Sequence, residues 1–316
     1  MAQQSTVEPV ASAPVLTTSP KRGRETGLAR LGRALVSNRK SAVGVGIFVF
    51  FVLIAILAPV IAPYSPTSTA FAPNLGPSAA HLFGTTAQGQ DVFSQFVYGA
   101  RTTLTVGIGA GLLATAISLL VGVTAGYRGG WVDTVLNFLS NIFLVLPGLA
   151  LLILIEAYMH QTSPLFNGLI IGLTGWAWGA RVFRAQTMTL AQRDFVTAAK
   201  LSGASDLRVM VTEIMPNMTS IIASNIMYAC LAAILAESGL AFLGLENVNA
   251  VSWGTMLYWA SQGDAILTGG WWWFIPPGLG IALVGLSLVL MNYGVDQLTN
   301  PRLRDITRRT RRAWHE

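Results

Sequence analysis

Charged side chains are scarce in this sequence of 316 residues, in which Lys, Arg, Asp and Glu together make up 11%. A soluble domain carries about 25% charged residues, so the composition argues against a soluble enzyme. Apolar residues make up 53% of the chain, and its 32 glycines and nine tryptophans are typical of membrane helices and their interfaces. The composition therefore predicts an integral membrane protein.

Residues and motifs of catalytic and metal sites are also missing. Cys230 is the one cysteine, which excludes an intrachain disulfide and a cysteine-based zinc or iron–sulfur site. His81, His160 and His315 show no metal-ligand spacing. The sequence has no GxxxxGK(S/T) phosphate loop and no HExxH or GxSxG motif. We therefore expect no catalytic residue, metal or cofactor in this chain, and no ATP hydrolysis by it.

Six apolar stretches are long enough to cross a bilayer, whose apolar core of about 30 Å requires about 20 residues of helix. The prediction is an all-α fold with six transmembrane helices, at Val43–Pro63, Thr102–Tyr127, Thr134–Ile155, Leu165–Gln186, Ile214–Ala236 and Ile275–Val295. Pro147 interrupts the third stretch and is expected to kink it. The fourth stretch is the weakest, because Arg181 and Arg184 fall in its last two turns.

Lys and Arg gather on one side of these stretches. Of the 20 basic residues, 19 lie in the two tails or in and beside the second and fourth links, and the other links contain only Arg101. This positive-inside pattern predicts that both termini lie in the cytoplasm. The net charge of +6 is expected to favour anionic lipid headgroups, and we do not interpret it as nucleic-acid binding.

The membrane stretches divide the chain into four parts. Residues 1–36 are expected to form a disordered and basic cytoplasmic tail, because residues 1–20 are rich in Ala, Ser, Thr and Pro without periodicity. Residues 37–101 hold the first membrane helix and an external loop. Residues 102–305 form a core of five helices, and residues 306–316 form a basic cytoplasmic tail.

The link between the fourth and fifth stretches, Thr189–Asn217, reads TLAQRDFVTAAKLSGASDLRVMVTEIMPN. Thr189 and Gln192 have the spacing of a capping box, which marks a helix start. Residues compatible with a helix run from Ala191 to Ser202. A short helix is therefore expected outside the membrane.

A second short helix is expected after a turn. Gly203 can take the left-handed conformation that ends a helix, and Ser205 can cap the next one. Pro216 is expected to close this second helix before the fifth membrane stretch.

Small and apolar side chains occur on the first of these two helices, at Phe195, Val196, Ala198, Ala199 and Leu201. Small side chains allow close approach of a partner, and apolar ones anchor a helix in a groove. The segment is therefore either a protein-docking element or an amphipathic connector that lies on the bilayer surface.

This segment resembles the EAA loop of ABC-importer permeases, whose pattern runs Glu-Ala-Ala, three residues, Gly and later Pro. The matching residues are Thr197-Ala198-Ala199, Gly203 and Pro216-Asn217. Thr197 stands where the family has its glutamate, a departure that bears on a salt bridge to the ATPase but not on the docking geometry.

Further blocks narrow the resemblance to the C-type permease subunit of the dipeptide, oligopeptide and nickel transport group. They are Leu82–Ser94, Tyr98–Arg101, Gly126–Asp133, Ala236–Leu245, Ser252–Leu257 and Asn300–Arg304. Together they extend over residues 38–305, so the resemblance is specific to the family and says little about the substrate.

The resemblance implies a fold, a location and a set of partners. The fold is that of type I ABC-importer permeases, with six transmembrane helices and a cytoplasmic coupling helix between helices four and five, in the bacterial cytoplasmic membrane. The partners are a homologous B-type permease, two ABC ATPase subunits that hold ATP and Mg, and an extracytoplasmic substrate-binding protein. The residues that this resemblance assigns to ATPase coupling are Phe195, Thr197, Ala198, Ala199, Lys200, Gly203, Ala204 and Pro216.

Three charged residues are candidates for an outer gate or a contact with the binding protein, namely Asp91, Arg101 and Glu237. Arg101 can pair with Asp91, with another carboxylate or with a lipid phosphate.

Glycines and tryptophans add two expectations about packing. Gly107 with Gly111, and Gly122 with Gly126, have the small-xxx-small spacing that permits close helix contact. The run Trp271-Trp272-Trp273 is typical of an aromatic belt at the membrane interface.

The expected function is that of a permease subunit in ATP-driven uptake of dipeptides or oligopeptides by alternating access. Uptake of a nickel chelate, haem or glutathione within the same family would use the same motifs. An alternative of another class is a stand-alone channel or secondary carrier. Against it, no charged residue lies in the middle of a stretch, where a proton relay would need one.

Overall fold

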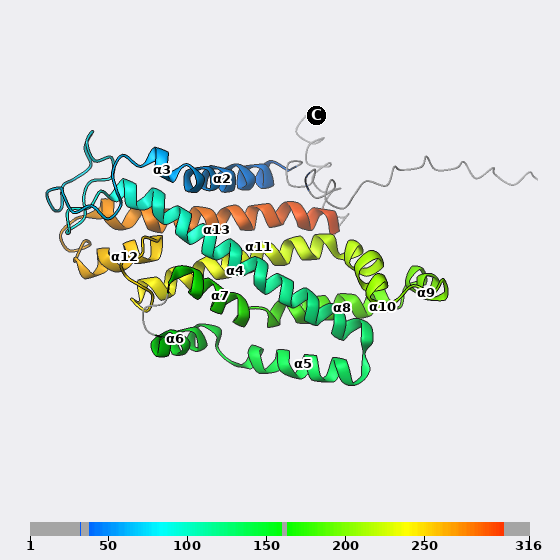
Figure 1. Cartoon of the computed structure of the whole chain (residues 1–316). Coiled ribbons are helices and arrows are strands. Elements are labelled where there is room, and N and C mark those ends of the chain that lie inside the picture. The colour runs from blue at the N-terminus through cyan, green and yellow to red at the C-terminus, as the bar shows by residue number, and fades with distance from the viewer. Residues whose placement is uncertain (1–31, 33–37, 160–162, 300–316) are drawn as a thin grey trace, which may run out of the picture.

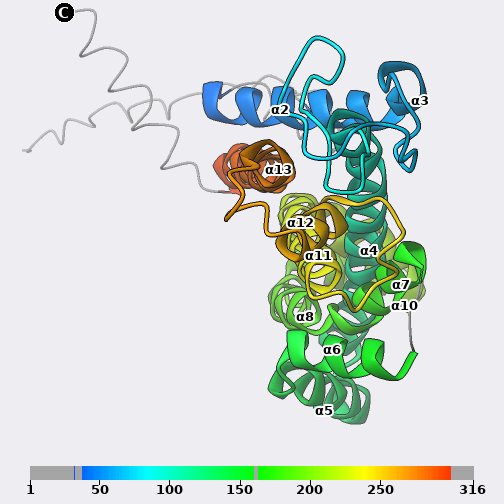
Figure 2. The same ribbon diagram turned by 90° about the vertical axis from the view of Figure 1, so that its left-hand side faces the viewer.

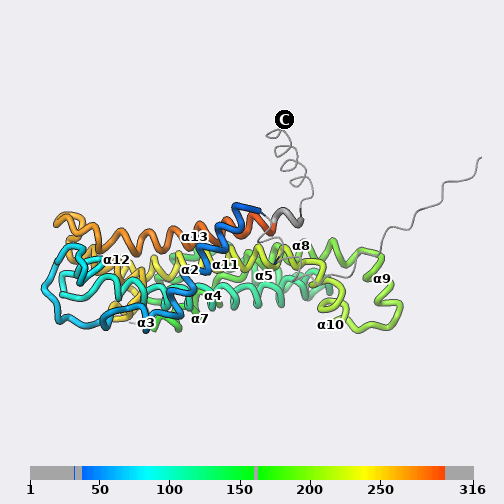
Figure 3. The backbone as a smooth tube through the Cα atoms, turned by 90° about the horizontal axis from the view of Figure 1, so that it is seen from above, coloured from blue at the N-terminus to red at the C-terminus, as the bar shows by residue number. Residues whose placement is uncertain are grey.

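The computed structural model describes residue 32 and residues 38–159 and 163–299. Long helices run side by side through this part of the chain (Figure 1). Two short helices, α9 (Asp194–Leu201) and α10 (Asp206–Arg208), lie at one end of the long helices, and α12 (Trp253–Gln262) lies at the other. Figure 3, seen from above, shows α9 and α10 projecting beyond the ends of the long helices. The segments expected inside and outside the membrane are thus separated in space.

Helix α4 (Val92–Arg128) is the central element and has 37 residues. It packs against α2 (Arg39–Ile56), α7 (Pro164–Thr174), α8 (Ala177–Ala191) and α11 (Thr219–Phe242). In the end-on view of Figure 2, α2 and α5 lie at opposite edges of the structure, with α4, α8 and α11 between them. The expected second membrane helix is present, and it begins ten residues earlier than predicted because Asp91 caps it at that point.

The two glycine pairs of α4 explain how these helices approach so closely. A side-chain carbon at Gly111 would lie 2.6 Å from the backbone nitrogen of Cys230 in α11, and Gly107 faces Ile234 one turn away. A carbon at Gly126 would lie 2.5 Å from the backbone oxygen of Arg184 in α8. The first pair therefore packs on α11 and the second on α8, which confirms the predicted role of the small residues.

The third expected stretch is two helices with a sharp bend between them. Helix α5 (Gly130–Val145) and helix α6 (Gly148–Met159) meet at an angle of 81°. Pro147 lies in the break, so the proline does more than kink a continuous helix. A bidentate salt bridge joins α5 to α8. In it, Arg184 Nε and Nη2 donate to the two carboxylate oxygens of Asp133 at 2.5 and 2.6 Å.

The fourth expected stretch is also divided, into α7 and α8, with Gly175 and Trp176 between them. Trp176 is buried against α4 and α5 side chains, and its backbone oxygen accepts a bond from Ser118 Oγ at 2.6 Å. The break therefore places a large aromatic side chain inside the bundle, while the Trp176 oxygen also accepts a bond from the N–H of Ala180 at 3.1 Å.

Four helical segments in the described part are long and apolar enough to cross a membrane, and the bent α5–α6 pair would be a fifth. They are Arg39–Ile56, Val92–Arg128, Asp206–Phe242 and Trp271–Val295. The prediction of six transmembrane helices is therefore confirmed only in part, because the third and fourth stretches are each broken into two helices.

The remaining elements close the end of the bundle where α12 lies. Helix α3 (Ala58–Ile61) follows α2, and residues 62–91 form a loop that leads to α4. Helix α13 (Trp271–Thr299) packs against α2 and α11. Trp273 is fully buried and Trp272 Nε1 donates to the backbone oxygen of Thr85 at 3.3 Å, so only Trp271 of this run is exposed as an interfacial belt requires.

Candidate functional site

The candidate coupling site, which the sequence predicts on the cytoplasmic side, is the segment from α9 to the start of α11, and it lies beyond the end of α4 (Figure 1). Helix α9 spans eight residues and is shorter than predicted. Thr189 lies inside α8, where its Oγ1 donates to the backbone oxygen of Ala185 at 3.2 Å, and Gln192 is the residue after the end of α8. The predicted capping box at Thr189 and Gln192 is therefore wrong, and α9 begins after Arg193 instead.

The end of α9 follows the prediction. Gly203 has a φ of +81°, and its N–H donates to the backbone oxygen of Lys200 at 2.9 Å. The N–H of Ala204 donates to the backbone oxygen of Ala199 at 3.1 Å. These two bonds occupy carbonyl groups that the helix end leaves without partners, and the positive φ at the turn favours glycine. Asp194 in the first turn and Lys200 in the last turn complement the helix dipole.

One side of α9 is anchored inside this chain. Val196 is fully buried in an apolar cluster with Val209 and Ile214, and Ala199 and Ala204 pack at the edge of that cluster. Val196 was expected to anchor a partner, and this expectation is wrong because its side chain is covered by this chain's own residues.

The other side of α9 is open. Phe195, Thr197, Ala198 and Lys200 are exposed, and Leu201 is 85% exposed. Contact of this leucine side chain with water is unfavourable. A partner protein that covered the side chain would therefore be stabilised by its burial.

The chain from α10 into α11 is continuous helix of changing pitch. A π-helical turn, η1 (Val209–Ile214), follows α10, and a 3-10 turn, η2 (Met215–Met218), leads directly to α11. Pro216 lies in the first turn of η2. The residue at this position of a helix donates no intrahelical hydrogen bond, so the missing N–H of proline costs none. The prediction that Pro216 ends the second helix is therefore wrong, and α10 is joined to a membrane-spanning helix without a loop.

The outer candidates lie at the opposite end. Asp91 is fully buried, and its Oδ2 accepts from the N–H and the hydroxyl of Ser94 at 2.8 and 2.7 Å, which caps α4. Its Oδ1 lies 2.8 Å from His81 Nδ1. Asp91 therefore pairs with His81 and not with Arg101, which is exposed on α4.

Glu237 is fully buried in the last two turns of α11. Its Oε2 accepts from Ser238 Oγ at 3.1 Å, and the side chains of Ser252 and Thr103 also bond to it. The structure thus brings none of the three outer candidates into contact with one another.

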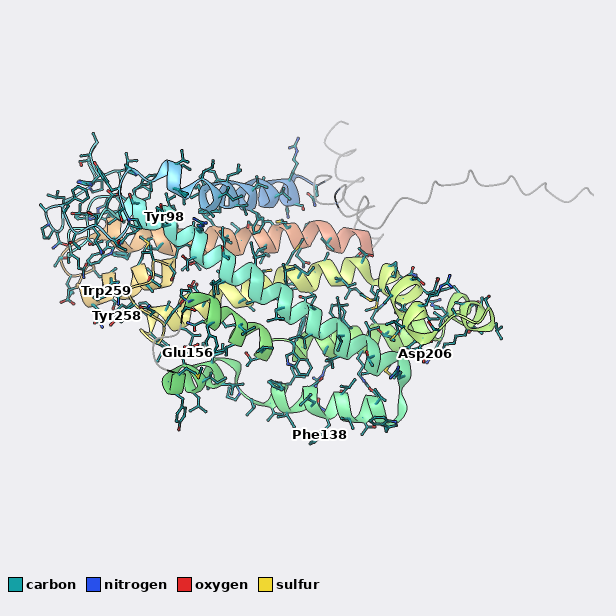
Figure 4. The ribbon with its side chains drawn as sticks, viewed as in Figure 1. Tyr98, Phe138, Glu156, Asp206, Tyr258 and Trp259 are labelled. Carbon is teal, nitrogen blue, oxygen red and sulfur yellow. The ribbon has the colours of Figure 1, made fainter. Side chains whose placement is uncertain are left out.

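Sequence reasoning missed Glu246, which is buried in the loop after α11 close to two other buried carboxyls, Glu237 and Glu156. Figure 4 places Glu156 on the same side of the bundle as Tyr258 and Trp259, far from Asp206. The pKa of Glu246 is raised from 4.5 to about 8, chiefly by burial and then by the negative charges of Glu237 and Glu156, while a hydrogen bond from Asn167 acts in the opposite direction. Only the folding of three elements onto one another brings these carboxyls together, so no local sequence signal marks them.

No group of three or more His, Cys, Asp and Glu side chains within residues 38–159 and 163–299 has an arrangement that could hold a metal ion.

Similarity to known proteins covers most of the chain. Residues 118–305 match the model of the family described as binding-protein-dependent transport system inner membrane component. Residues 28–77 match the model of the N-terminal transmembrane domain of oligopeptide transport permease C.

Individual relatives match this chain over most of their own length. The dipeptide transport system permease protein DppC of Bacillus subtilis is 34% identical over 277 residues, which are 86% of this chain and 85% of the relative. The oligopeptide transport system permease protein OppC of Mycobacterium tuberculosis is 30% identical over 282 residues, which are 88% of this chain and 96% of the relative. The dipeptide permease DppC of Alkalihalophilus pseudofirmus is 33% identical over 275 residues, 86% of this chain and 89% of the relative.

Proposed function

This chain belongs to the family of binding-protein-dependent inner membrane transport components, and we propose that it is the C-type permease subunit of an ATP-driven importer of dipeptides or oligopeptides. The relatives named as dipeptide or oligopeptide transport permeases match over 85% or more of their length, including the segment of α9. The chain would form one half of a translocation path that opens to the two sides of the membrane in turn.

The observation that carries the coupling part of this proposal is the placement of α9. It projects beyond the bundle. One side of it is anchored to this chain by the buried Val196, and the other side leaves Leu201 open to a partner. Two membrane-embedded elements, α8 before it and α11 after it, are joined to this segment by short connections. A partner that moved α9 would therefore pull on both helices, as a coupling helix must do.

The proposed topology has six crossings, formed by α2, α4, the α5–α6 pair, the α7–α8 pair, α11 and α13. The broken pairs are compatible with a membrane protein because non-helical backbone inside a bundle is tolerated where the protein itself covers it. The distribution of Lys and Arg supports the proposal that both termini and α9 lie on the cytoplasmic side of a bacterial inner membrane.

The proposed partners complete the importer. A homologous B-type permease forms the other half of the path, and an extracytoplasmic binding protein delivers substrate to the end where α12 lies. Two ABC ATPase subunits bind ATP and Mg, since this chain has no phosphate-binding loop. The basic tails would contact anionic lipids.

A tagged pull-down from native membranes in mild detergent, followed by quantitative mass spectrometry, tests the assembly. We expect one homologous permease and two ATPase subunits for each copy of this chain. Recovery of this chain alone as a stable homo-oligomer would contradict the proposal and favour a channel or secondary carrier.

Uptake of a labelled dipeptide by cells tests the docking face. Leu201→Asp and Ala198→Trp change exposed residues of α9, and each is expected to lower uptake about tenfold or more while the chain stays in the membrane. Thr134→Ala is the control, since Thr134 is exposed on α5, outside the α9 segment, and its hydroxyl donates to the backbone oxygen of Gly130 in the same helix at 3.0 Å. Uptake that is equal in all three variants would argue against docking through α9.

A further inference from the structure

The last turn of α4 contacts both short helices of the α9–α10 segment through one side chain. The hydroxyl of Tyr127 donates to Asp206 Oδ1 at 3.1 Å. The ammonium nitrogen of Lys200 lies 4.6 Å from the centre of the Tyr127 ring, which is within the range of a cation–π contact. Lys200 is in the last turn of α9 and Asp206 is the first residue of α10.

These contacts span the glycine turn between the two short helices. Gly203 lies between Lys200 and Asp206, and a side-chain carbon there would meet no atom within 4 Å. Gly203 itself is therefore unpacked, although Ala204 beside it packs on the buried cluster that contains Val196 and Val209. Tyr127 contacts the helix on each side of the turn and so restrains the angle between α9 and α10 from a third element.

The position of Tyr127 links the segment to a helix that it does not follow in the chain. Through its covalent connections, α9 is continuous only with α8 and, by way of α10, with α11. Helix α4 is the element on which both of these helices pack, and it reaches the opposite end of the bundle at Asp91. The contact between Lys200 and Tyr127 thus joins α9 directly to the central helix α4.

We propose that Tyr127 is a positioning residue, which ties the α9–α10 segment to α4 so that a displacement of α9 moves α4 together with α8 and α11. This inference rests on the proposed role of α9 in coupling to ATPase subunits. Asp206 fixes the hydroxyl of Tyr127, and Lys200 holds the face of its ring.

A purely structural role for these contacts makes a different prediction. The fold of the segment has its own support in the buried cluster of Val196, Val209 and Ile214. The ring of Tyr127 packs at the edge of this cluster, whereas its hydroxyl and the carboxylate of Asp206 lie at the surface. Removal of the hydroxyl or the carboxylate should therefore leave the segment folded and change only how it moves with α4.

The test uses the complete importer in proteoliposomes and measures labelled dipeptide uptake and ATP hydrolysis in the same vesicles. Tyr127→Phe and Asp206→Ala each remove the hydrogen bond, and we expect the ATP hydrolysed per peptide to rise about threefold or more. Asp206→Asn keeps an oxygen that accepts the bond and is expected to restore the wild-type ratio. Thr134→Ala, which removes an exposed hydroxyl that donates to the backbone oxygen of Gly130 within α5, is expected to leave the ratio unchanged.

The outcomes separate this inference from the proposed function. A wild-type complex that assembles and transports, with an unchanged ratio in Tyr127→Phe and Asp206→Ala, would overturn the inference alone. Equal losses of uptake and hydrolysis, with loss of ATPase subunits from the purified complex, would also overturn it, because they indicate a structural role. Failure of the wild-type chain to purify with any ATPase would overturn the proposed function.

Discussion

Gly111 in α4 faces Cys230 in α11 so closely that a side-chain carbon on Gly111 would lie 2.6 Å from both the backbone nitrogen and the sulfur of Cys230. The two helices therefore meet backbone to backbone at this point. Gly109, two residues earlier in the same helix, is exposed and has no atom within 4 Å of its equivalent position. The same helix therefore has one glycine in close contact with α11, Gly111, and one with free space around it, Gly109.

This difference gives a prediction about stability. Gly111→Val should force α4 and α11 apart and lower the free energy of unfolding by about 1–3 kcal/mol, as overpacking of a close contact does. Gly109→Ala is the matched control and should have no destabilising effect, because its methyl group meets open space. Thermal unfolding of the purified complex in detergent measures both, and equal melting temperatures for the two variants would contradict the close contact.

A second prediction concerns the loop of residues 62–91. Asp91→Ala removes the N-cap of α4 and the bond to His81, and should lower the free energy of unfolding by about 1–3 kcal/mol. Arg101→Ala should change it by less than about 0.5 kcal/mol, because Arg101 is exposed and Asp91 bonds to His81 instead. Limited proteolysis from the outer side reports on this loop. Faster cleavage in Arg101→Ala than in Asp91→Ala would show that the pairing is assigned wrongly.

The spans were largely predictable from the sequence, and the breaks within them were not. Thr102–Tyr127 lies wholly within α4, because a long apolar stretch has few alternatives to a membrane helix. The 81° bend near Pro147 and the break at Trp176 depend on what each half packs against. A proline marks the position of a bend but does not set its angle.

The candidate site divides in the same way. The turn at Gly203 follows from the chain alone, since a glycine after a helical segment has a known local role. Whether Val196 or Leu201 faces a partner depends on which side of α9 meets η1, and both are apolar in the sequence. The contacts of Tyr127 and the approach of Glu246 to Glu156 join residues far apart in the chain, which no local pattern records.

The third prediction follows from the raised pKa of Glu246. An exposed glutamate loses its proton near 4.5, whereas Glu246 in the folded chain keeps its proton up to about pH 8. The folded state therefore binds more protons than the unfolded state between these values. Its free energy of unfolding should fall as the pH rises through this window, by up to about 1.4 kcal/mol per pH unit.

Glu246→Gln tests this pH dependence. The amide is neutral at every pH, so the variant should show a flatter melting temperature between about pH 5 and about pH 8. Asp264→Asn, at an exposed carboxyl after α12, is the control and should follow the wild type. A Glu246→Gln profile parallel to that of the wild type would show that this carboxyl is ionised in the folded chain.

Contact between α9 and an ATPase subunit is the central claim, and thiol crosslinking tests it most directly. Cys230 is the one cysteine of the chain and is buried, so Leu201→Cys introduces the accessible thiol at a position that is 85% exposed. Leu267→Cys places a thiol with 84% exposure at the opposite end of the bundle as the control. A short bifunctional crosslinker should join residue 201 to an ATPase subunit, with a yield that changes on addition of ATP, and residue 267 to none. Absence of that product from Leu201→Cys in an importer that still transports would contradict the account.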